Sequence, residues 1–149
     1  MGASEAGRYP HSVRATIRLT THRRGLHDVT ERIRAIVRSS GIRDGICVAY
    51  LKHTSASLIV QENHEPSARQ DLEAFFDRFA PDGDPRFTHV TEGPDDMASH
   101  IRAAVTRTSE TFLVESGDLV IGKWQGIFLF EHRTAPHERV IELRIVKDD

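Results

Sequence analysis

Histidines in polar stretches are the part of this sequence best suited to chemistry. Neutral imidazole binds transition metals and also transfers protons near neutral pH. Three imidazoles that leave a fourth position open form a catalytic zinc-type site, in which nearby carboxylates orient the other ring nitrogens. Of the nine histidines, six stand in such stretches, and we expect at least two of them to converge. These six are His53, His64, His89, His100, His132 and His137.

No short motif supplies this metal site ready-made. The chain lacks HExxH and His-x-His, so the ligands have to come from separate segments. Asp96 and His100 are four residues apart and therefore share one face of a helix. For any single histidine, a local hydrogen bond or solvent exposure is the simpler interpretation. His64 and His137 neighbour proline-containing turns, which makes them the weakest ligand candidates.

A nucleophilic serine is a weaker alternative to the metal site. Ser55 and Ser57 follow His53 closely, but no GxSxG elbow is present, and these small residues fit the packing of a strand better. The chain also lacks the GxxxxGK[ST] and GxGxxG phosphate-binding loops. Binding of a phosphate would therefore depend on separate cationic side chains or on a helix N-terminus.

The densest group of polar side chains follows an apolar run at residues 127–130. Glu131, His132 and Arg133 come directly after this run, which predicts a strand that delivers an acid, an imidazole and a guanidinium to one place. An anionic substrate that contains a ring would have four cationic or aromatic side chains available in this part of the chain: Arg133, Arg139, Lys123 and Trp124.

Length and composition indicate one soluble globular domain. The chain has 149 residues, 38% of them hydrophobic and 28% charged, with a net charge of -2. This balance gives no electrostatic footprint for nucleic acid, and no segment reaches the roughly 20 apolar residues of a membrane span. We therefore expect no nucleic-acid or membrane partner and a cytoplasmic location. Cys47, the only cysteine, lies in an apolar run that predicts a buried strand position.

Hydrophobic periodicity predicts three helices among strands. A capping-box pattern begins the first helix at Asp28, and Gly41 ends it. Pro66 begins the second helix, and Pro94 occupies the first position of the third. The predicted strands cover residues 12–21, 45–52, 55–61, 111–115, 118–122, 126–132 and 139–146.

Apolar side chains at helical spacing predict which helix faces are buried. The second helix places Leu72, Phe75, Phe76 and Phe79 on one stripe, and the third places Met97, Ile101, Ala104 and Val105 on another. Two arginines of the third helix region, Arg102 and Arg107, are expected in solvent.

This order of elements predicts an α+β fold with a mostly antiparallel sheet. Strands stand at both ends of the sequence and helices in the middle. The last strands are too closely spaced for the helical crossovers that a parallel sheet needs. Residues 1–11 are expected to form a flexible tail, and residues 12–149 one compact domain.

Several short segments, taken in order, resemble the YjbQ family, whose members are named secondary thiamine-phosphate synthase enzymes. The resemblance covers nearly the whole chain beyond the tail. It rests on HTSAS at residues 53–57, QEN at 61–63, EGPDDM at 92–97 with histidines on either side, GKWQGI at 122–127 and EHR at 131–133. The sequence departs from the usual family pattern at Ala98-Ser99, at Lys123 and at His64.

The resemblance implies a homotrimer with a histidine-rich site and a divalent metal, zinc or alternatively magnesium. The metal ligands that it implies are His89, His100 and His132. The catalytic polar residues expected at the site are Glu131, Asp96, Glu62, Asn63 and His53. The substrate-binding residues expected are Arg133, Arg139, Trp124 and Lys123.

The implied activity joins a pyrimidine diphosphate to a thiazole phosphate with release of pyrophosphate, so the expected partner is a small phosphorylated metabolite. A metal-dependent hydrolase with Glu131 or Asp96 as general base is one alternative. A trimer that binds metal or metabolite without turnover is the other. The sequence leaves open the physiological substrate, the metal, the sharing of a site between subunits and whether synthase activity is the main role.

Overall fold

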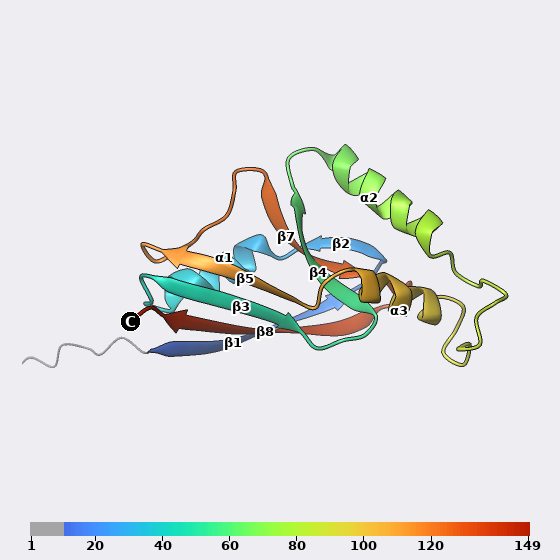
Figure 1. Cartoon of the computed structure of the whole chain (residues 1–149), viewed down its shortest axis with the longest axis horizontal. Helices are drawn as coiled ribbons and strands as arrows, with labels where there is room; N and C mark the ends of the chain where they lie inside the picture. Colours follow the sequence, from blue (N-terminus) through green and yellow to red (C-terminus); the bar gives the residue numbers. More distant parts are fainter. Residues whose placement is uncertain (1–10) are drawn as a thin grey trace, which may run out of the picture.

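Two antiparallel sheets and three helices make up the protein in a computed structural model that describes residues 11–149 (Figure 1). The larger sheet has the strand order β1-β8-β3-β5-β6, and the smaller has the order β2-β7-β4. All the strand pairs are antiparallel. The fold is therefore α+β, as predicted. Of the predicted tail, residues 1–10 lie outside the described residues.

The larger sheet contains β1 (Ser12–Thr21), β3 (Gly45–Leu51), β5 (Ser109–Glu115), β6 (Asp118–Leu119) and β8 (His137–Lys147). The smaller sheet contains β2 (Gly25–Asp28), β4 (Ala56–Glu62) and β7 (Gln125–Glu131). The helices are α1 (Thr30–Ser39), α2 (Pro66–Phe79) and α3 (Asp96–Val105). Among the described helices, none is long and apolar enough to span a membrane.

The main core lies between the two sheets, with α1 packed against it. It includes Ile17 and Ile141 from the larger sheet, Leu58 and Leu129 from the smaller, and Ile33 from α1. Cys47 is also in this core, fully buried as predicted, and burial raises the pKa of its thiol to about 11. Alternation along each strand turns one side chain in two toward this core.

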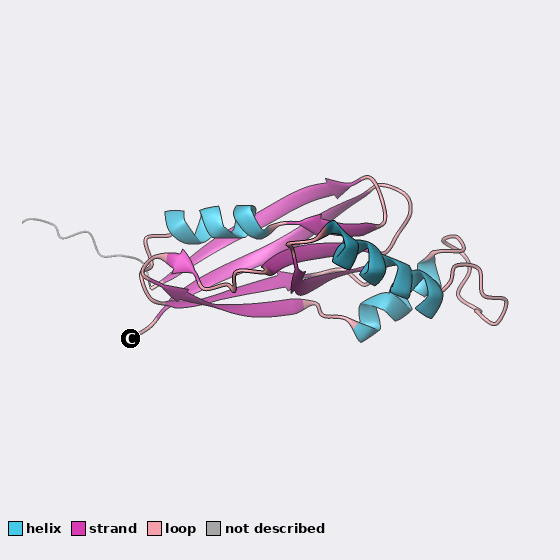
Figure 2. Cartoon of the chain, turned by 90° about the horizontal axis from the view of Figure 1, so that it is seen from above, coloured by secondary structure: helices cyan, strands magenta, loops and turns pink. Residues whose placement is uncertain are grey.

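A second, smaller core lies on the other face of the small sheet, where α2 covers it. Phe76 of α2 packs there against Leu26, Phe128 and Phe130. Strand β7 is consequently buried on both faces, which explains its unbroken apolar run. Helices α2 and α3 lie near each other at one end of the molecule, and α1 lies toward the other (Figure 2). His89 and His100 belong to this end, since His89 lies between α2 and α3 and His100 lies on α3.

Two predicted helix starts differ from the structure. Asp28 accepts hydrogen bonds from the backbone N–H and the hydroxyl of Thr30, at 2.9 and 2.6 Å, but it ends strand β2, which was not predicted. The other half of the capping box is absent, because Glu31 pairs with Arg34 at 3.0 Å. Helix α3 begins at Asp96 and not at Pro94.

Both predictions of a buried helix face need correction. On α2, Phe76 is buried, but Phe75 and Phe79 are 49% and 47% exposed, because the narrow sheet beneath the helix covers only part of the stripe. On α3, the predicted stripe turns outward, and Val105 is 56% exposed. The buried residues of α3 are Asp96, Ala98, Ser99, Arg102 and Ala103.

The prediction that Arg102 lies in solvent is wrong, since its side chain is only 1% exposed. The inner face of α3 tolerates it because the guanidinium Nη2 donates to the Ala80 carbonyl at 2.9 Å, and its Nη1 lies 3.5 Å from Asp77. A buried cation needs such partners to offset the loss of hydration. Arg107 lies in solvent, as predicted.

Candidate metal centre

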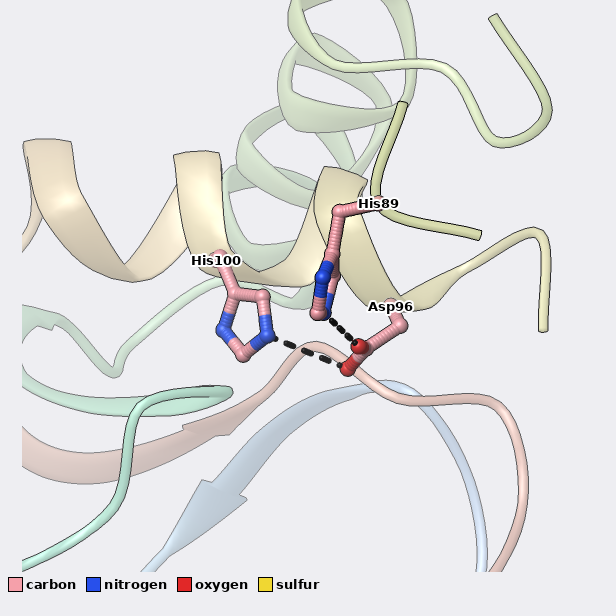
Figure 3. Close-up of side chains that lie close together, drawn as sticks. All are labelled: His89, Asp96 and His100. Carbon is pink, nitrogen blue, oxygen red and sulfur yellow. Dashed lines mark hydrogen bonds and ion pairs between the residues drawn. The ribbon is translucent and has the colours of Figure 1, made fainter. Parts of the chain in front are cut away.

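His89, Asp96 and His100 converge at the start of α3 (Figure 3). Their ligand atoms all lie within 4.8 Å of one another. His89 reaches this place from the loop between α2 and α3, while Asp96 and His100 stand one turn apart on the helix. The i, i+4 spacing seen in the sequence thus supplies two of the three groups, and the loop supplies the third.

The Asp96 carboxylate stands between the two imidazole rings. Its Oδ2 lies 2.7 Å from His89 Nε2, and its Oδ1 lies 3.3 Å from His100 Nε2. The Asp96 side chain is 1% exposed, against 51% for His89 and 29% for His100. Burial pushes the pKa of Asp96 upward, but the hydrogen bond to His89 and the nearby charges of His100 and Arg133 hold it below its ordinary value.

The tautomer of His100 is set by a backbone contact. Its Nδ1 lies 2.8 Å from the Thr54 carbonyl oxygen, which can only accept, so Nδ1 carries a proton. In the neutral ring, Nε2 then presents a lone pair toward Asp96. A second ring proton or a bound cation would make this 3.3 Å approach of two acceptors attractive. This donor set fits a divalent metal, with the Thr54 carbonyl as the partner that orients the ligand.

Arg133, from the turn between β7 and β8, holds the carboxylates in place. Its Nη1 donates to Asp96 Oδ1 at 2.9 Å, and its Nε donates to Asp95 Oδ2 at 3.1 Å. Asp95 also accepts from the Thr134 backbone N–H at 2.9 Å. Burial alone would raise the pKa of Asp95. The hydrogen bonds from Thr134 and Arg133 outweigh burial and lower this pKa to about 2. The start of α3 is thereby fastened to the turn that follows β7.

Glu131 lies beside this turn but inside the protein. It is completely buried, and Arg139, 3% exposed, donates to its Oε2 at 2.6 Å. The Thr21 hydroxyl donates to the same oxygen at 2.7 Å. Burial raises the pKa of Glu131, and the bonds from Arg139 and Thr21 outweigh burial and lower it. Glu131 and Arg139 are therefore bound to each other rather than presented to a ligand.

His132 does not join the two other histidines. It is fully buried, with Nε2 2.7 Å from the Ser57 hydroxyl. That hydroxyl also contacts Thr106, whose own hydroxyl donates to the Arg102 carbonyl at 2.7 Å. The chain of donors makes Ser57 donate to Thr106 and His132 Nε2–H donate to Ser57. Within residues 11–149, His132 Nδ1 is buried with no partner.

The environment of His132 keeps its ring neutral. Burial is the main cause, and the charge of Arg102 adds to it, so the pKa of His132 falls to about 3. The third member of the metal-capable cluster is Asp96, expected as a catalytic residue, and not His132, which the resemblance implied. The reason is that β7 turns alternate side chains to opposite faces, and His132 follows Phe130 toward the α2 side, 4.5 Å from it between ring centroids.

The other expected site residues lie in two further places. His53 stands beside His100 on the wall of a cavity, and burial lowers its pKa, helped by the charge of Arg139. Glu62, Asn63, Lys123 and Trp124 lie at the opposite end of β4, where Glu62 pairs with Gln125 across the sheet. The structure does not bring these four to the metal-capable group, because β4 runs extended for seven residues from Ala56 to Glu62 and keeps the two places apart.

The far group forms a separate polar surface. Asn63 Nδ2 donates to Asp28 Oδ2 at 2.7 Å, and both residues line a cavity of about 430 Å³ together with Lys123 and Gln125. His64 lies against Trp124, with ring centroids 4.2 Å apart, and the Lys123 ammonium lies 4.8 Å from the indole. Whether these residues bind substrate stays a prediction.

Two residues that support the metal-capable cluster were not among the expected site residues. In the sequence, Asp95 and Thr54 appear only as members of the EGPDDM and HTSAS segments that carry the family resemblance. Asp95 fastens Arg133, and Thr54 orients His100 through its carbonyl group. The adjacency of Asp95 and Asp96 was the signal available for Asp95. A backbone carbonyl leaves no trace in residue types, so Thr54 had none.

The fold and the site together define a small α+β protein with a two-histidine, one-carboxylate cluster at the start of a helix. Residues 15–148 match the family model described as UPF0047 protein YjbQ-like. The chain belongs to this family.

Relatives in this family match over most of the chain. UPF0047 protein sll1880 of Synechocystis is 44% identical over 127 residues, which cover 85% of this chain and 86% of that protein. UPF0047 protein YjbQ of Escherichia coli O157:H7 is 41% identical over 119 residues, covering 79% and 86%. Among solved structures, hypothetical protein APE1520 from Aeropyrum pernix K1 has a TM-score of 0.82 at 26% identity, covering 91% and 99%. These similarities establish the family and the fold.

Proposed function

We propose that His89, Asp96 and His100 bind a divalent metal, and that the protein is a metal-dependent enzyme acting on a small phosphorylated metabolite. The observation that carries the proposal is the convergence of three ligand atoms within 4.8 Å of one another. Two of these atoms are imidazole nitrogens and the third is a carboxylate oxygen. Two imidazoles and one carboxylate leave coordination positions open for a substrate. Nitrogen ligands favour zinc over magnesium, which prefers oxygen, and the same triad also suits iron(II).

The reaction that we propose for this site is the thiamine-phosphate synthase reaction, as a secondary activity. A divalent metal, when bound at this site, would neutralise the negative charge on the leaving diphosphate. Arg133 adds to this, because its guanidinium lies 2.9 Å from Asp96 and brings positive charge to the cluster. Asp96 fixes both imidazoles, and Asp95 fixes Arg133, so the polar groups are held in place before a substrate arrives.

The hydrolase alternative has less support from the geometry. It requires Glu131 or Asp96 to accept a proton as general base. Glu131 is completely buried and bound to Arg139, and its pKa is lowered. Asp96 is bound by Arg133, and its pKa is lowered as well. Both carboxylates are therefore poor proton acceptors near neutral pH.

We also propose the homotrimer, on the strength of apolar side chains left exposed near the metal centre. Phe75 and Phe79 stack on each other on α2, and Val90 and Val105 are 63% and 56% exposed on the segments that carry the histidines. A second copy would bury them. Light scattering on purified protein should give three times the mass of one chain, and a monomeric mass would remove this proposal.

Elemental analysis of purified protein tests the metal site first. We expect near-stoichiometric metal in the wild type and its loss in His100→Ala and Asp96→Ala. His64→Ala is the matched control, since His64 contacts Trp124 outside the cluster and should leave the metal content unchanged. Equal metal content in all four proteins, or none in the wild type, would refute the site.

Product formation from the pyrimidine diphosphate and the thiazole phosphate then tests the reaction. We expect the metal-loaded wild type to form thiamine phosphate and His100→Ala to lose this activity. If both are equally inactive at high enzyme concentration, the synthase assignment fails while the metal site stands. A protein that retains metal and binds phosphorylated ligands without turnover would then be the remaining interpretation.

A further inference from the structure

A cavity of about 470 Å³ adjoins the metal centre. Its wall is mostly apolar and includes His53, Thr54, His100 and two alanines of α3, Ala103 and Ala104, with Thr108. His100 belongs both to this wall and to the metal-capable group. A ligand that binds the metal therefore has room to extend along the His100 ring into the cavity. The volume lies within the range of small-molecule sites.

The tautomer of His53 gives this cavity a polar point. The Val140 backbone N–H donates to His53 Nε2 at 2.9 Å, so that Nε2 holds no proton. A neutral His53 then carries its proton on Nδ1. Within the described part of the chain, no acceptor bonds this Nδ1–H. The wall of the cavity therefore offers a hydrogen-bond donor to an acceptor atom on a ligand.

The two histidines of the wall differ in which ring nitrogen is left available to a ligand. His100 donates a hydrogen bond from Nδ1–H to the Thr54 carbonyl oxygen and turns its other nitrogen toward Asp96. His53 uses its other nitrogen as an acceptor and keeps Nδ1–H free. One ring thus suits a metal and the other suits a neutral acceptor. Among the described residues that form this wall, none has a charged side chain that could pair with a charged group on a ligand.

We propose that this cavity binds the uncharged ring of a ligand whose anionic head is held at the metal centre, with a ring acceptor atom bonded to His53 Nδ1–H. The ligand class is a small aromatic or heteroaromatic compound that carries a metal-binding group. This inference rests on the metal site proposed above. Side chains from a second copy of the chain are the competing occupant of the cavity.

Calorimetric titration of zinc-loaded protein with three hydroxamates tests the proposal. Acetohydroxamate carries the metal-binding head alone, benzohydroxamate adds a ring, and nicotinohydroxamate adds a ring with an acceptor nitrogen. We expect benzohydroxamate to bind roughly tenfold or more tightly than acetohydroxamate, because the ring leaves water for an apolar wall. Nicotinohydroxamate should bind more tightly still.

Two variants separate the parts of the cavity. Ala104→Trp places a large side chain at an exposed position of the wall, so it should abolish the gain from the ring and leave acetohydroxamate binding unchanged. His53→Leu should keep the gain from the ring and lose the preference for nicotinohydroxamate. Zinc content and circular dichroism of each variant verify that the metal site and the fold persist.

The outcomes distinguish this inference from the proposed function. If zinc does not bind to the wild type, the metal centre fails and the inference falls with it. If zinc and acetohydroxamate bind but the ring adds no affinity, the metal centre stands and the cavity proposal is overturned, as it would be if a second copy filled the cavity. An equal gain from the ring in Ala104→Trp would overturn it too.

Discussion

Replacing Arg139 with methionine tests whether Arg139 and Glu131 act within the fold or on a substrate. Arg139 is 3% exposed and Glu131 is completely buried, and Arg139 Nε donates to Glu131 Oε2 at 2.6 Å. Without Arg139, Glu131 retains only the Thr21 hydroxyl and the Arg133 backbone N–H. An uncompensated buried charge of this kind costs about 3–5 kcal/mol of unfolding free energy.

For a chain of this size, that loss corresponds to a fall in Tm of roughly 10 °C. Thermal unfolding followed by circular dichroism at one fixed protein concentration measures it. Arg144→Met is the matched control, because Arg144 lies in solvent on the same strand and should change Tm little. The double variant Glu131→Gln/Arg139→Met should be more stable than Arg139→Met alone, since it removes both charges.

The pH dependence gives a second check on the pair. With Arg139 absent, its hydrogen bond and charge no longer lower the pKa of Glu131, so the pKa should rise toward what burial favours. The cost of the substitution should therefore shrink as pH falls and Glu131 takes up a proton. If Arg139→Met unfolds within a degree or two of Arg144→Met at neutral pH and only loses substrate binding, Arg139 belongs to a substrate site and the structural interpretation is wrong.

Two further predictions concern acid stability. Asp95 has a pKa of about 2 against an ordinary 3.8, so its contribution of about 2 kcal/mol is present above pH 4 and is lost as pH falls toward 2. Asp95→Asn should remove this loss of unfolding free energy between pH 4 and pH 2. If stability falls equally with pH in the variant and the wild type, the prediction is wrong. His132 has a pKa of about 3 against 6.5, so the unfolded chain takes up its proton first and wild-type stability falls by about 1.4 kcal/mol per pH unit below pH 6. His132→Gln keeps an N–H donor for Ser57 and should show a shallower decline; an unchanged slope would mean that His132 is not buried in solution.

The sequence predicted most of the strands, because alternation with a period of two directly reflects which side chains face a core. It missed β2, a strand of four residues that pairs with β7 and carries too few side chains to show a period. It also predicted the end of α1, where Gly41 adopts a positive φ of 76°. A left-handed residue after a helix is a local requirement, so it is visible in the sequence.

Helix faces were predicted less well, because a helical stripe shows that a face is apolar but not what covers it. The stripe of Phe75 and Phe79 remains half exposed in one chain. In α3, the inner face instead carries Arg102 and Ser99, which donate to the carbonyl groups of Ala80 and His132, just beyond the ends of α2 and β7. Such partners come from distant parts of the chain, so no local pattern announces them.

The sequence by itself determined the antiparallel α+β class, the family and the pairing of Asp96 with His100, since these depend on local periodicity, spacing and motif order. Tertiary structure alone decided which other groups join them. It brought His89 to Asp96 across a loop, turned His132 inward to Ser57, and enclosed Glu131 with Arg139. The physical reason is that burial and long-range hydrogen bonds decide whether an ionisable side chain is free to meet a ligand.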